Sequence, residues 1–205
     1  MKDTSPMKAA PPFCAPVTLT GRHAVLEPLS HDHHDGLCEA AGDGELWRLW
    51  YTSIPKPEGM RADIDTRLGL QAAGSMLPFA IRDRATGRIA GMTTYLHIDA
   101  ARRRLEIGAT WVARSLQRSG LNTECKLLLL THAFESLGCI AVEFRTSFFN
   151  HTSRAAIARL GAKQDGILRN HGFHADGTLR DSVVFSITDA EWPGVKANLT
   201  HQLTR

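Results

Sequence analysis

Hydrophobic and polar residues follow two different periods along this chain, and each period predicts one kind of element. Between residues 105 and 111, apolar side chains occupy every second position, which predicts a half-buried strand with one apolar face: Leu105, Ile107, Ala109 and Trp111. Between residues 127 and 137, apolar side chains recur every three or four positions, which predicts an amphipathic helix: Leu127, Leu130, Phe134 and Leu137. Strand-like and helix-like stretches take turns, so we expect an α/β (α+β) chain.

The order of these stretches predicts how the strands connect. A strand pair at 17–20 and 24–28 is followed by two helices, and residues 78–83, 89–98 and 105–111 form an antiparallel meander. Next come a strand at 140–145, a helix that ends at Gly161, a hairpin and a terminal helix that opens at residues 189–193. The helix between the strands at 105–111 and 140–145 predicts a parallel crossover.

Length and composition favour one soluble domain. At 205 residues, with 43% hydrophobic and 22% charged residues, the chain suits a single domain, which we place at 17–205 after a loose, uncleaved tail at 1–16. No apolar run approaches the roughly 18 residues that cross a bilayer, so we expect no membrane span. Four cysteines without a Cys-x-x-Cys pair indicate thiols rather than disulfides or zinc, and hence a cytoplasmic protein.

Charge gives little reason to expect nucleic acid or metal. The formal net charge is only +3, and the run Arg102-Arg103-Arg104 favours a solvated hairpin turn over a phosphate contact. His31, His33 and His34 are neighbours at a helix entry, which does not present a converging set of metal ligands.

One turn, at residues 117–124, is suited to an anion. It places small or polar residues where the helix begins, so the first backbone N–H groups of the helix have no partners within it. These donors, the positive end of the helix dipole and the charge of Arg118 together predict a phosphate or pyrophosphate, and hence a nucleotide-containing cofactor.

The residues around this turn resemble the GNAT N-acetyltransferases, and within them the RimJ/RimL-type branch. The pattern Gln/Arg-x-x-Gly-x-Gly/Ala is matched at residues 117–122, with Asn122 in place of the usual small residue; its short amide suits a helix N-cap. Glu106-Ile107-Gly108 before the turn, Thr123-Glu124 after it, and Asn150-x-x-Ser153 with Leu160-Gly161-Ala162 further on follow in the order of that branch. The resemblance covers roughly residues 17–203.

The resemblance implies a fold and a co-substrate. The fold is a GNAT-like mixed, mostly antiparallel central sheet with a splayed strand pair and helices on both faces. The co-substrate is acetyl-CoA, with no metal. Its pyrophosphate would be held at the turn and its pantetheine along an opened strand edge and by Asn150, so the implied cofactor-binding residues are Thr110, Trp111, Val112, Gln117, Arg118, Ser119, Gly120, Leu121, Asn122, Thr123 and Asn150.

Two residues are candidates for proton transfer. Many GNAT enzymes use a tyrosine as the acid, but the tyrosines here, Tyr51 and Tyr95, lie elsewhere, so the resemblance assigns the acid role to Ser153. A first-turn hydroxyl that caps its own helix is the alternative for Ser153, as an N-cap is for Asn150. Glu106 is the candidate base, and a structural partner to Arg145 or Arg104 is its alternative.

The resemblance implies a primary amine as the acceptor, either a protein N-terminus or a small molecule. Trp47, Trp50 and Tyr51 suit an acceptor wall or plain helix packing, and His171 and His174 suit the same cleft or the surface. Apolar residues of the last hairpin and helix, such as Trp192, offer a surface for a homodimer. A non-catalytic acyl-CoA-binding module is the alternative function.

Overall fold

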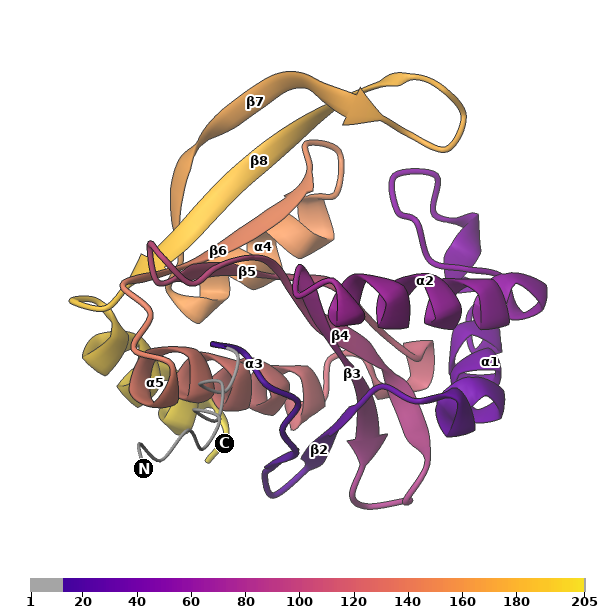
Figure 1. Cartoon of the computed structure of the whole chain (residues 1–205), viewed down its shortest axis with the longest axis horizontal. Helices are drawn as coiled ribbons and strands as arrows, with labels where there is room; N and C mark the ends of the chain where they lie inside the picture. Colours follow the sequence, from indigo (N-terminus) through magenta and orange to yellow (C-terminus); the bar gives the residue numbers. More distant parts are fainter. Residues whose placement is uncertain (1–12, 205) are drawn as a thin grey trace, which may run out of the picture.

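A computed structural model describes residues 13–204, and its eight strands form one sheet in the order β1-β2-β3-β4-β5-β6-β8-β7 (Figure 1). Neighbouring strands are antiparallel except β5 and β6, which are parallel. The strands are β1 (Leu19–Thr20), β2 (Ala24–Pro28), β3 (Met76–Asp83), β4 (Ile89–Asp99), β5 (Arg104–Val112), β6 (Ala141–Ser147), β7 (Lys163–Phe173) and β8 (Leu179–Thr188). The mixed, mostly antiparallel sheet predicted from the sequence is therefore confirmed.

Helices cover both faces of the sheet and create two cores. One core lies under α1 and α2 and includes Met92 and Trp111; the other lies under α3, α4 and α5 and includes Leu105 and Ile107. The α-helices are α1 (His34–Gly42), α2 (Met60–Ala72), α3 (Gly120–Thr131), α4 (His151–Leu160) and α5 (Trp192–Gln202). Shorter helical turns are η1 (His31–His33), η2 (Leu46–Arg48), η3 (Pro57–Gly59), η4 (Arg114–Leu116) and a π-helical turn at His132–Ser136.

A bulge in β5 corrects the strand prediction. Thr94 pairs with Gly108, and Met92 pairs with Trp111. Between these two pairs β5 has two residues, whereas β4 has one, so β5 contains one extra residue. Ala109 takes a left-handed φ of 46° there. An extra residue reverses the alternation of side chains, so Trp111 faces the opposite core from Leu105 and the predicted single apolar face is wrong beyond residue 109.

The predicted splayed strand pair is also present. β5 and β6 pair at only three positions, Arg104 with Ala141, Leu105 with Val142 and Glu106 with Glu143. Beyond Glu106 the two strands have no paired residues, although both continue. The edge of β5 from residue 107 onward therefore faces an opening instead of a neighbouring strand.

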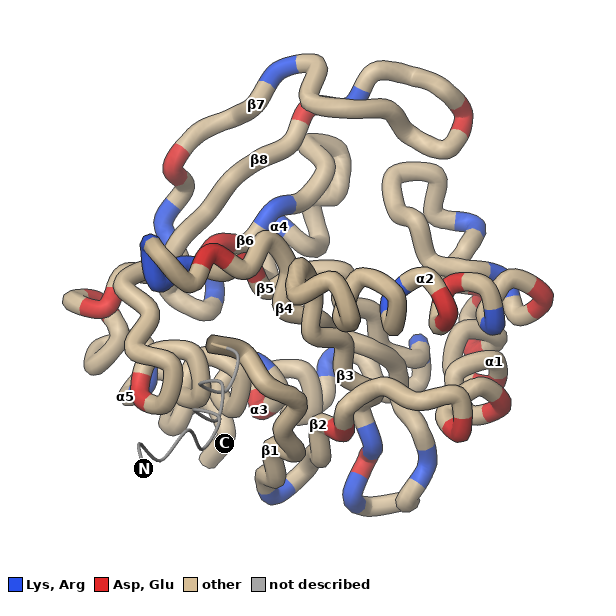
Figure 2. The backbone as a smooth tube through the Cα atoms, in the orientation of Figure 1, with Lys and Arg blue, Asp and Glu red and all other residues tan. Residues whose placement is uncertain are grey.

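Charged residues of both signs are spread over the elements, with acidic ones gathered along α1 and α2 (Figure 2). The basic run is an exposed turn between β4 and β5, as predicted, where Arg102 pairs with Asp99 at 2.8 Å. Arg104 already belongs to β5 and pairs with Glu143 at 2.7 Å. No helix in residues 13–204 is long and apolar enough to cross a membrane.

Residues near both ends of the described chain pack against the core. Most of the predicted tail, residues 1–12, lies outside the described residues, while Phe13 and Cys14 pack against the core of α3. Burial raises the pKa of the Cys14 thiol to about 12. In α5, Trp192 and Leu199 are buried, and Trp192 stacks on Phe134, so these residues offer no free surface for a homodimer. The last hairpin does expose apolar side chains: Phe173 and Leu179.

Candidate active site

The opening between β5 and β6 is the first part of the candidate site. Backbone N–H and C=O groups along a strand require hydrogen-bond partners, and the edge of β5 beyond Glu106 has none on β6. β5 leads through η4 to the start of α3, and β6 leads to the start of α4. Because the two strands are parallel, both helices begin at the same, splayed end of the pair. A ligand that completes the β5 edge would reach both helix starts.

The turn before α3 presents backbone N–H groups without acceptors in the described residues. Arg118 has a left-handed φ of 62°, and Arg118, Ser119 and Gly120 are all exposed. Within residues 13–204, the N–H groups of these three residues have no hydrogen-bond acceptor. They lie at the start of a helix of 12 residues, and the positive end of the helix dipole adds to their attraction for an anion. This is the arrangement that the sequence predicted for a phosphate.

The helix cap is Ser119 rather than Asn122. The N–H of Leu121 donates to Ser119 Oγ at 3.3 Å, and the Ser119 hydroxyl donates to the Leu116 carbonyl at 2.7 Å. Asn122 lies inside the first turn, where its Oδ1 is buried without a partner in the described residues. The suggested N-cap role of Asn122 is wrong because α3 begins two residues earlier, at Gly120.

Two motif residues have distinct structural roles. Gln117 Nε2 donates to the Val112 carbonyl at 2.9 Å, which ties the turn to the end of β5. Gly120 has room for a side chain, because an added Cβ would lie 3.5 Å from Leu203 and 3.6 Å from His23, which are ordinary contacts. The fold itself therefore does not require glycine at position 120, and any such requirement comes from what binds there.

The remaining cofactor candidates can contribute only their backbone. Leu121 and Thr123 are buried in the first turn of α3, and Trp111 and Val112 are buried in opposite cores. Thr110 is half-buried, and its hydroxyl bonds to neighbouring side chains.

The start of α4 brings Asn150 and Ser153 together. Asn150 is the N-cap, and its Oδ1 accepts a hydrogen bond from the N–H of Ser153 at 3.0 Å. This confirms the capping role of Asn150, which leaves its side-chain NH₂ free to donate. The hydroxyl of Ser153 is different, because it has no hydrogen-bond partner within the described residues and does not cap the helix. A half-buried hydroxyl is therefore available beside the opening.

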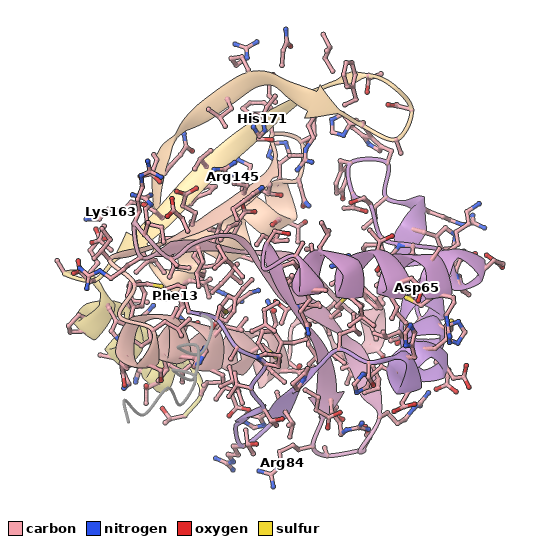
Figure 3. The ribbon with its side chains drawn as sticks, in the orientation of Figure 1. Phe13, Asp65, Arg84, Arg145, Lys163 and His171 are labelled. Atoms are coloured by element: carbon pink, nitrogen blue, oxygen red, sulfur yellow. The ribbon has the colours of Figure 1, made fainter. Side chains whose placement is uncertain are left out.

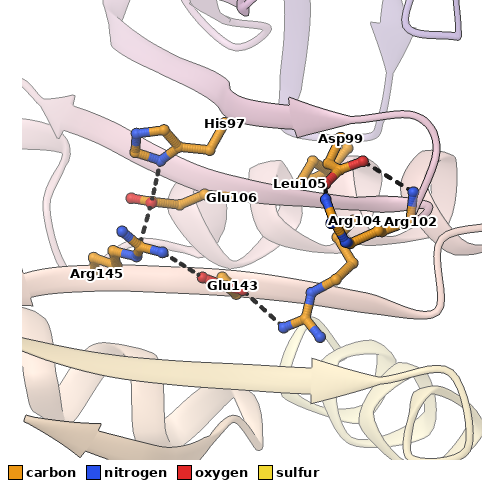
Figure 4. Close-up of a pocket in the computed structure, with 8 residues that line it drawn as sticks. All are labelled: His97, Asp99, Arg102, Arg104, Leu105, Glu106, Glu143 and Arg145. Carbon is orange, nitrogen blue, oxygen red and sulfur yellow. Dashed lines mark hydrogen bonds and ion pairs between the residues drawn. The ribbon is translucent and has the colours of Figure 1, made fainter.

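Glu106 lies at the vertex of the opening, in a network of alternating charges (Figure 4). It is 5% exposed and accepts a hydrogen bond from His97 Nδ1 at 2.9 Å. Arg145 Nε lies 3.4 Å from Glu106 and Arg145 donates to Glu143 at 2.9 Å, so the predicted partnership with Arg145 is present. Figure 3 labels Arg145 on the sheet below the last hairpin. These residues line a cavity of about 210 Å³.

A second bulge turns His97 toward Glu106. Leu96 pairs with Glu106 and Asp99 with Arg104, so β4 carries the extra residue here. His97 has a left-handed φ of 46°, a conformation that costs on the order of 1 kcal/mol in a residue other than glycine.

Burial raises the pKa of Glu143, but hydrogen bonds from Arg145 and Arg104 outweigh it and leave that pKa below its usual value.

The aromatic residues separate into two groups. Trp47 packs against the core under α1 and α2, which is the helix-packing role. Trp50 is 46% exposed, and its ring lies 5.7 Å from Tyr51, 5.5 Å from Phe149 and 4.7 Å from His174, centroid to centroid. We call these four residues the aromatic wall. It comes from three distant segments and meets α4 at Phe149, directly before Asn150.

The histidine predictions have mixed outcomes. His174 is buried, which rules out the surface alternative for it, while His171 is exposed and bonds to Ser182 at 3.1 Å (Figure 3). The imidazoles of the helix entry face three different carboxylates, at 2.6 to 3.0 Å: His31 with Asp65, His33 with Glu27 and His34 with Asp35. Residues 13–204 hold no group of three or more His, Cys, Asp or Glu side chains that could bind a metal ion.

Sequence reasoning missed His97, Phe149 and Lys126. For Phe149 the sequence did contain a signal, because the aromatic pair Phe148-Phe149 lies directly before Asn150. His97 and Lys126 carried no local signal, because their partners lie 9 to 33 residues away along the chain.

Comparison with known proteins places this geometry in a family. The chain is 33% identical over 110 residues to the "Putative ribosomal N-acetyltransferase YdaF" of Bacillus subtilis (strain 168); the match spans 54% of this chain and 59% of that protein. A GCN5-related N-acetyltransferase from Brucella melitensis is 29% identical with a TM-score of 0.83, covering 94% of this chain and 87% of the other. Mycobacterium smegmatis RimJ, solved in complex with CoA-disulfide, shares the fold at 22% identity, with a TM-score of 0.77 over 91% and 95% of the two chains.

The family model described as an acetyltransferase (GNAT) domain matches residues 23–163, which include β2 to β6, the turn before α3, and Asn150 and Ser153 on α4. The chain belongs to the GNAT acetyltransferase domain family.

Proposed function

We propose that this protein is an acetyl-CoA-dependent N-acetyltransferase that forms an amide on a primary amine by direct attack. The observation that carries the proposal is the edge of β5 that does not pair with β6, which leads into a turn with three N–H groups that have no acceptor in the described part of the chain. An extended polar chain that ends in a pyrophosphate would satisfy both features at once. Coenzyme A has that shape, and the GNAT family uses acetyl-CoA.

The residues present fit this co-substrate. The backbone N–H groups of residues 118–123 would hold the pyrophosphate, and the backbone of residues 110–112 would pair with pantetheine. The side-chain NH₂ of Asn150 and the unpartnered Oδ1 of Asn122 add a donor and an acceptor. When bound, acetyl-CoA supplies an activated acyl group as a thioester.

The roles of the side chains follow from this placement. Glu106 accepts the proton that the acceptor amine loses, through water in the cavity that it lines. A backbone N–H at the β5 edge stabilises the negative charge that develops on the acyl oxygen. The amine nitrogen forms the new bond to the acyl carbon as the C–S bond breaks, and the Ser153 hydroxyl gives its proton to the departing sulfur. Ser153 regains a proton from solvent, so the products are the amide and the free thiol.

We propose a peptide or protein N-terminus as the acceptor. The relative named above as a ribosomal N-acetyltransferase supports a protein acceptor. The aromatic wall, which includes Trp50 and Tyr51, lies beside the start of α4 and would contact the residues behind the amine. Trp47 is not part of that wall, because it packs against the core.

A thioester-consumption assay tests the proposed function. Acetyl-CoA is supplied with a panel of short peptides with free N-termini, the same peptides with blocked N-termini, and polyamines. We expect turnover on free peptide N-termini and none on blocked ones. Turnover on polyamines alone would overturn the proposed acceptor. Coenzyme binding without turnover on any amine would instead indicate the non-catalytic acyl-CoA-binding module.

The substitution Gly120→Ala tests the phosphate site. Since the fold leaves room for a Cβ at this position, thermal unfolding should not change, whereas the methyl group would obstruct the approach of phosphate oxygens. We expect calorimetric titration with coenzyme A to show affinity weaker by about tenfold or more. Gly69→Ala, in the last turn of α2 where an added Cβ meets open space, is the control that should leave affinity unchanged. Unchanged affinity in Gly120→Ala would contradict the placement of the pyrophosphate.

The substitution Ser153→Ala tests the acid. We expect kcat to fall by about 100-fold, because a positioned proton donor contributes on that order, while the dissociation constant for coenzyme A stays the same. The neighbouring Thr152→Ala, on the exposed side of α4, should keep the kcat of the unmodified protein. If both variants turn over equally fast, the sulfur receives its proton from another group.

The substitution Glu106→Gln tests the base. Glutamine keeps the shape of the side chain but cannot accept a proton, so kcat should fall by about 100-fold and the low-pH limb of the pH–rate profile should disappear. Glu143→Gln removes the other carboxylate that contacts Arg145 and should retain that limb. A Glu106→Gln profile that still falls on the acid side would assign the limb to a different group.

A further inference from the structure

A buried lysine joins the phosphate-binding helix to the bulge in β5. Lys126 lies on α3, and the residue is 6% exposed. Its Nζ donates to Thr110 Oγ1 at 2.7 Å and to Thr93 Oγ1 at 3.3 Å, and the two hydroxyl oxygens are 2.8 Å apart. This triangle connects α3, β4 and β5 at one point.

Stability alone does not account for this lysine. Burial lowers the pKa of Lys126 to about 8, because the charged ammonium is removed from water. Within residues 13–204 no carboxylate pairs with it, and its polar contacts are the two threonine hydroxyls. An apolar side chain of similar length would avoid the desolvation cost, so the ammonium must serve a purpose other than packing.

The position of Thr110 indicates that purpose. Ala109 and Thr110 are the bulge residues, which have no partner in the register between β4 and β5. An ammonium has only donors, so Thr110 Oγ1 accepts from Lys126. The Thr110 hydroxyl is then free to donate, and the Gly108 carbonyl lies 3.3 Å away. Lys126 thus holds the hydroxyl of Thr110 within the bulge, and the same hydroxyl contacts Gly108, the residue directly before the bulge.

We infer that Lys126 is a positioning residue for acyl transfer, which holds the β5 bulge so that its backbone N–H meets the acyl oxygen. The inference rests on the proposed function, because it assigns a purpose to the shape of the same strand edge. Lys126 acts through Thr110 and does not itself touch the reacting atoms. The same contact sets the distance between the bulge and the turn before α3, which together would hold the two ends of the co-substrate.

The substitution Lys126→Met tests the inference, since methionine keeps the length of the side chain without its charge. We expect kcat to fall by about 10- to 100-fold, the dissociation constant for coenzyme A to change by less than about threefold, and the unfolding temperature at pH 7 to stay equal or rise. A purely structural lysine would give the opposite pattern, with a lower unfolding temperature and an unchanged kcat. Lys196→Met, which removes an exposed lysine paired with Glu135, is the matched control.

Thr110 provides a second test that does not depend on the folding of Lys126→Met. Thr110→Ser keeps the hydroxyl and should retain most of the kcat, whereas Thr110→Val keeps the shape and should lose as much as Lys126→Met. The double variant Lys126→Met with Thr110→Val should lose little more than either alone, because both remove the same contact. Additive losses, or a Thr110→Val variant with full activity, would overturn the inference.

The burial of the charge has its own test in the pH dependence of stability. The pKa of Lys126 is about 8 in the folded chain and near 10.5 when unfolded, so the unmodified protein gains stability as pH rises from about 8 to 10.5. Lys126→Met lacks this gain, so the difference in unfolding temperature between the two should shrink over that range. Among residues 13–204, the titratable neighbour whose charge acts on Lys126 is Cys125, and burial raises the pKa of Cys125 to about 12, so its thiol stays neutral over that range. A constant difference would contradict a buried ammonium.

Amide hydrogen exchange separates failure of this inference from failure of the proposed function. Without any substrate, residues 108–112 should exchange faster in Lys126→Met than in the unmodified protein, while α4 should be unchanged. If the unmodified protein acetylates no amine but shows this difference, the proposed function fails and the bracing of the bulge stands. If exchange at residues 108–112 is the same in both, the inference fails whatever the activity.

Discussion

The short parallel pairing of β5 and β6 is the constraint on which the rest of the site depends. Three residue pairs join the strands, and after Glu106 an interior strand of the sheet has a free edge. The bulge at Ala109 produces this divergence, because an extra residue bends β5 and increases its twist. Gly91 makes the bend possible from the other side, since a Cβ there would lie 2.1 Å from the Trp111 carbonyl oxygen.

Helix α3 fixes the geometry of the opening from several directions. The carboxylate of Glu124 accepts hydrogen bonds from three consecutive backbone N–H groups, those of Arg22, His23 and Ala24 at the start of β2. Two residues later, Lys126 contacts β4 and β5 from the same helix. Helix α3 therefore contacts β2 through Glu124 and contacts β4 and β5 through Lys126. Its N-terminus and the bulge cannot move independently of each other.

The sequence predicted most elements of this fold because their patterns are local. The helix stripe from Leu127 to Leu137, the turn before α3 and the Asn150 cap could each be recognised within about a dozen residues. The side-chain alternation of β5 could not, because one residue with a left-handed φ, Ala109, reverses it without any change in the apolar pattern. The cap of α3 was not predicted either. Ser119, rather than Asn122, could be identified as the cap only once the first residue of α3 was known.

Side-chain contacts across the sheet were beyond sequence reasoning for a different reason. The aromatic wall brings Trp50 against Phe149 and His174, which lie about a hundred residues or more further along the chain, so no local pattern could indicate these contacts. The Lys126 triangle spans 33 residues between its most distant members. Lys126 lies beside the apolar stripe of its helix, where a surface lysine is expected, so no local pattern indicated its burial.

The charged residues around Glu106 bear on both roles considered for it, which are catalytic base and structural partner of Arg145. Arg145 gives Glu143 a hydrogen bond at 2.9 Å, whereas its Nε lies 3.4 Å from Glu106 and makes no hydrogen bond to any residue that the structure describes. The closest partner of Glu106 is instead His97, whose side chain is 68% exposed. A carboxylate that is nearly buried thus has a hydrogen bond to a group in contact with solvent. Glu143 is therefore the main structural partner of Arg145. For the proposed base Glu106, the hydrogen bond to His97 is a route by which a proton can reach solvent.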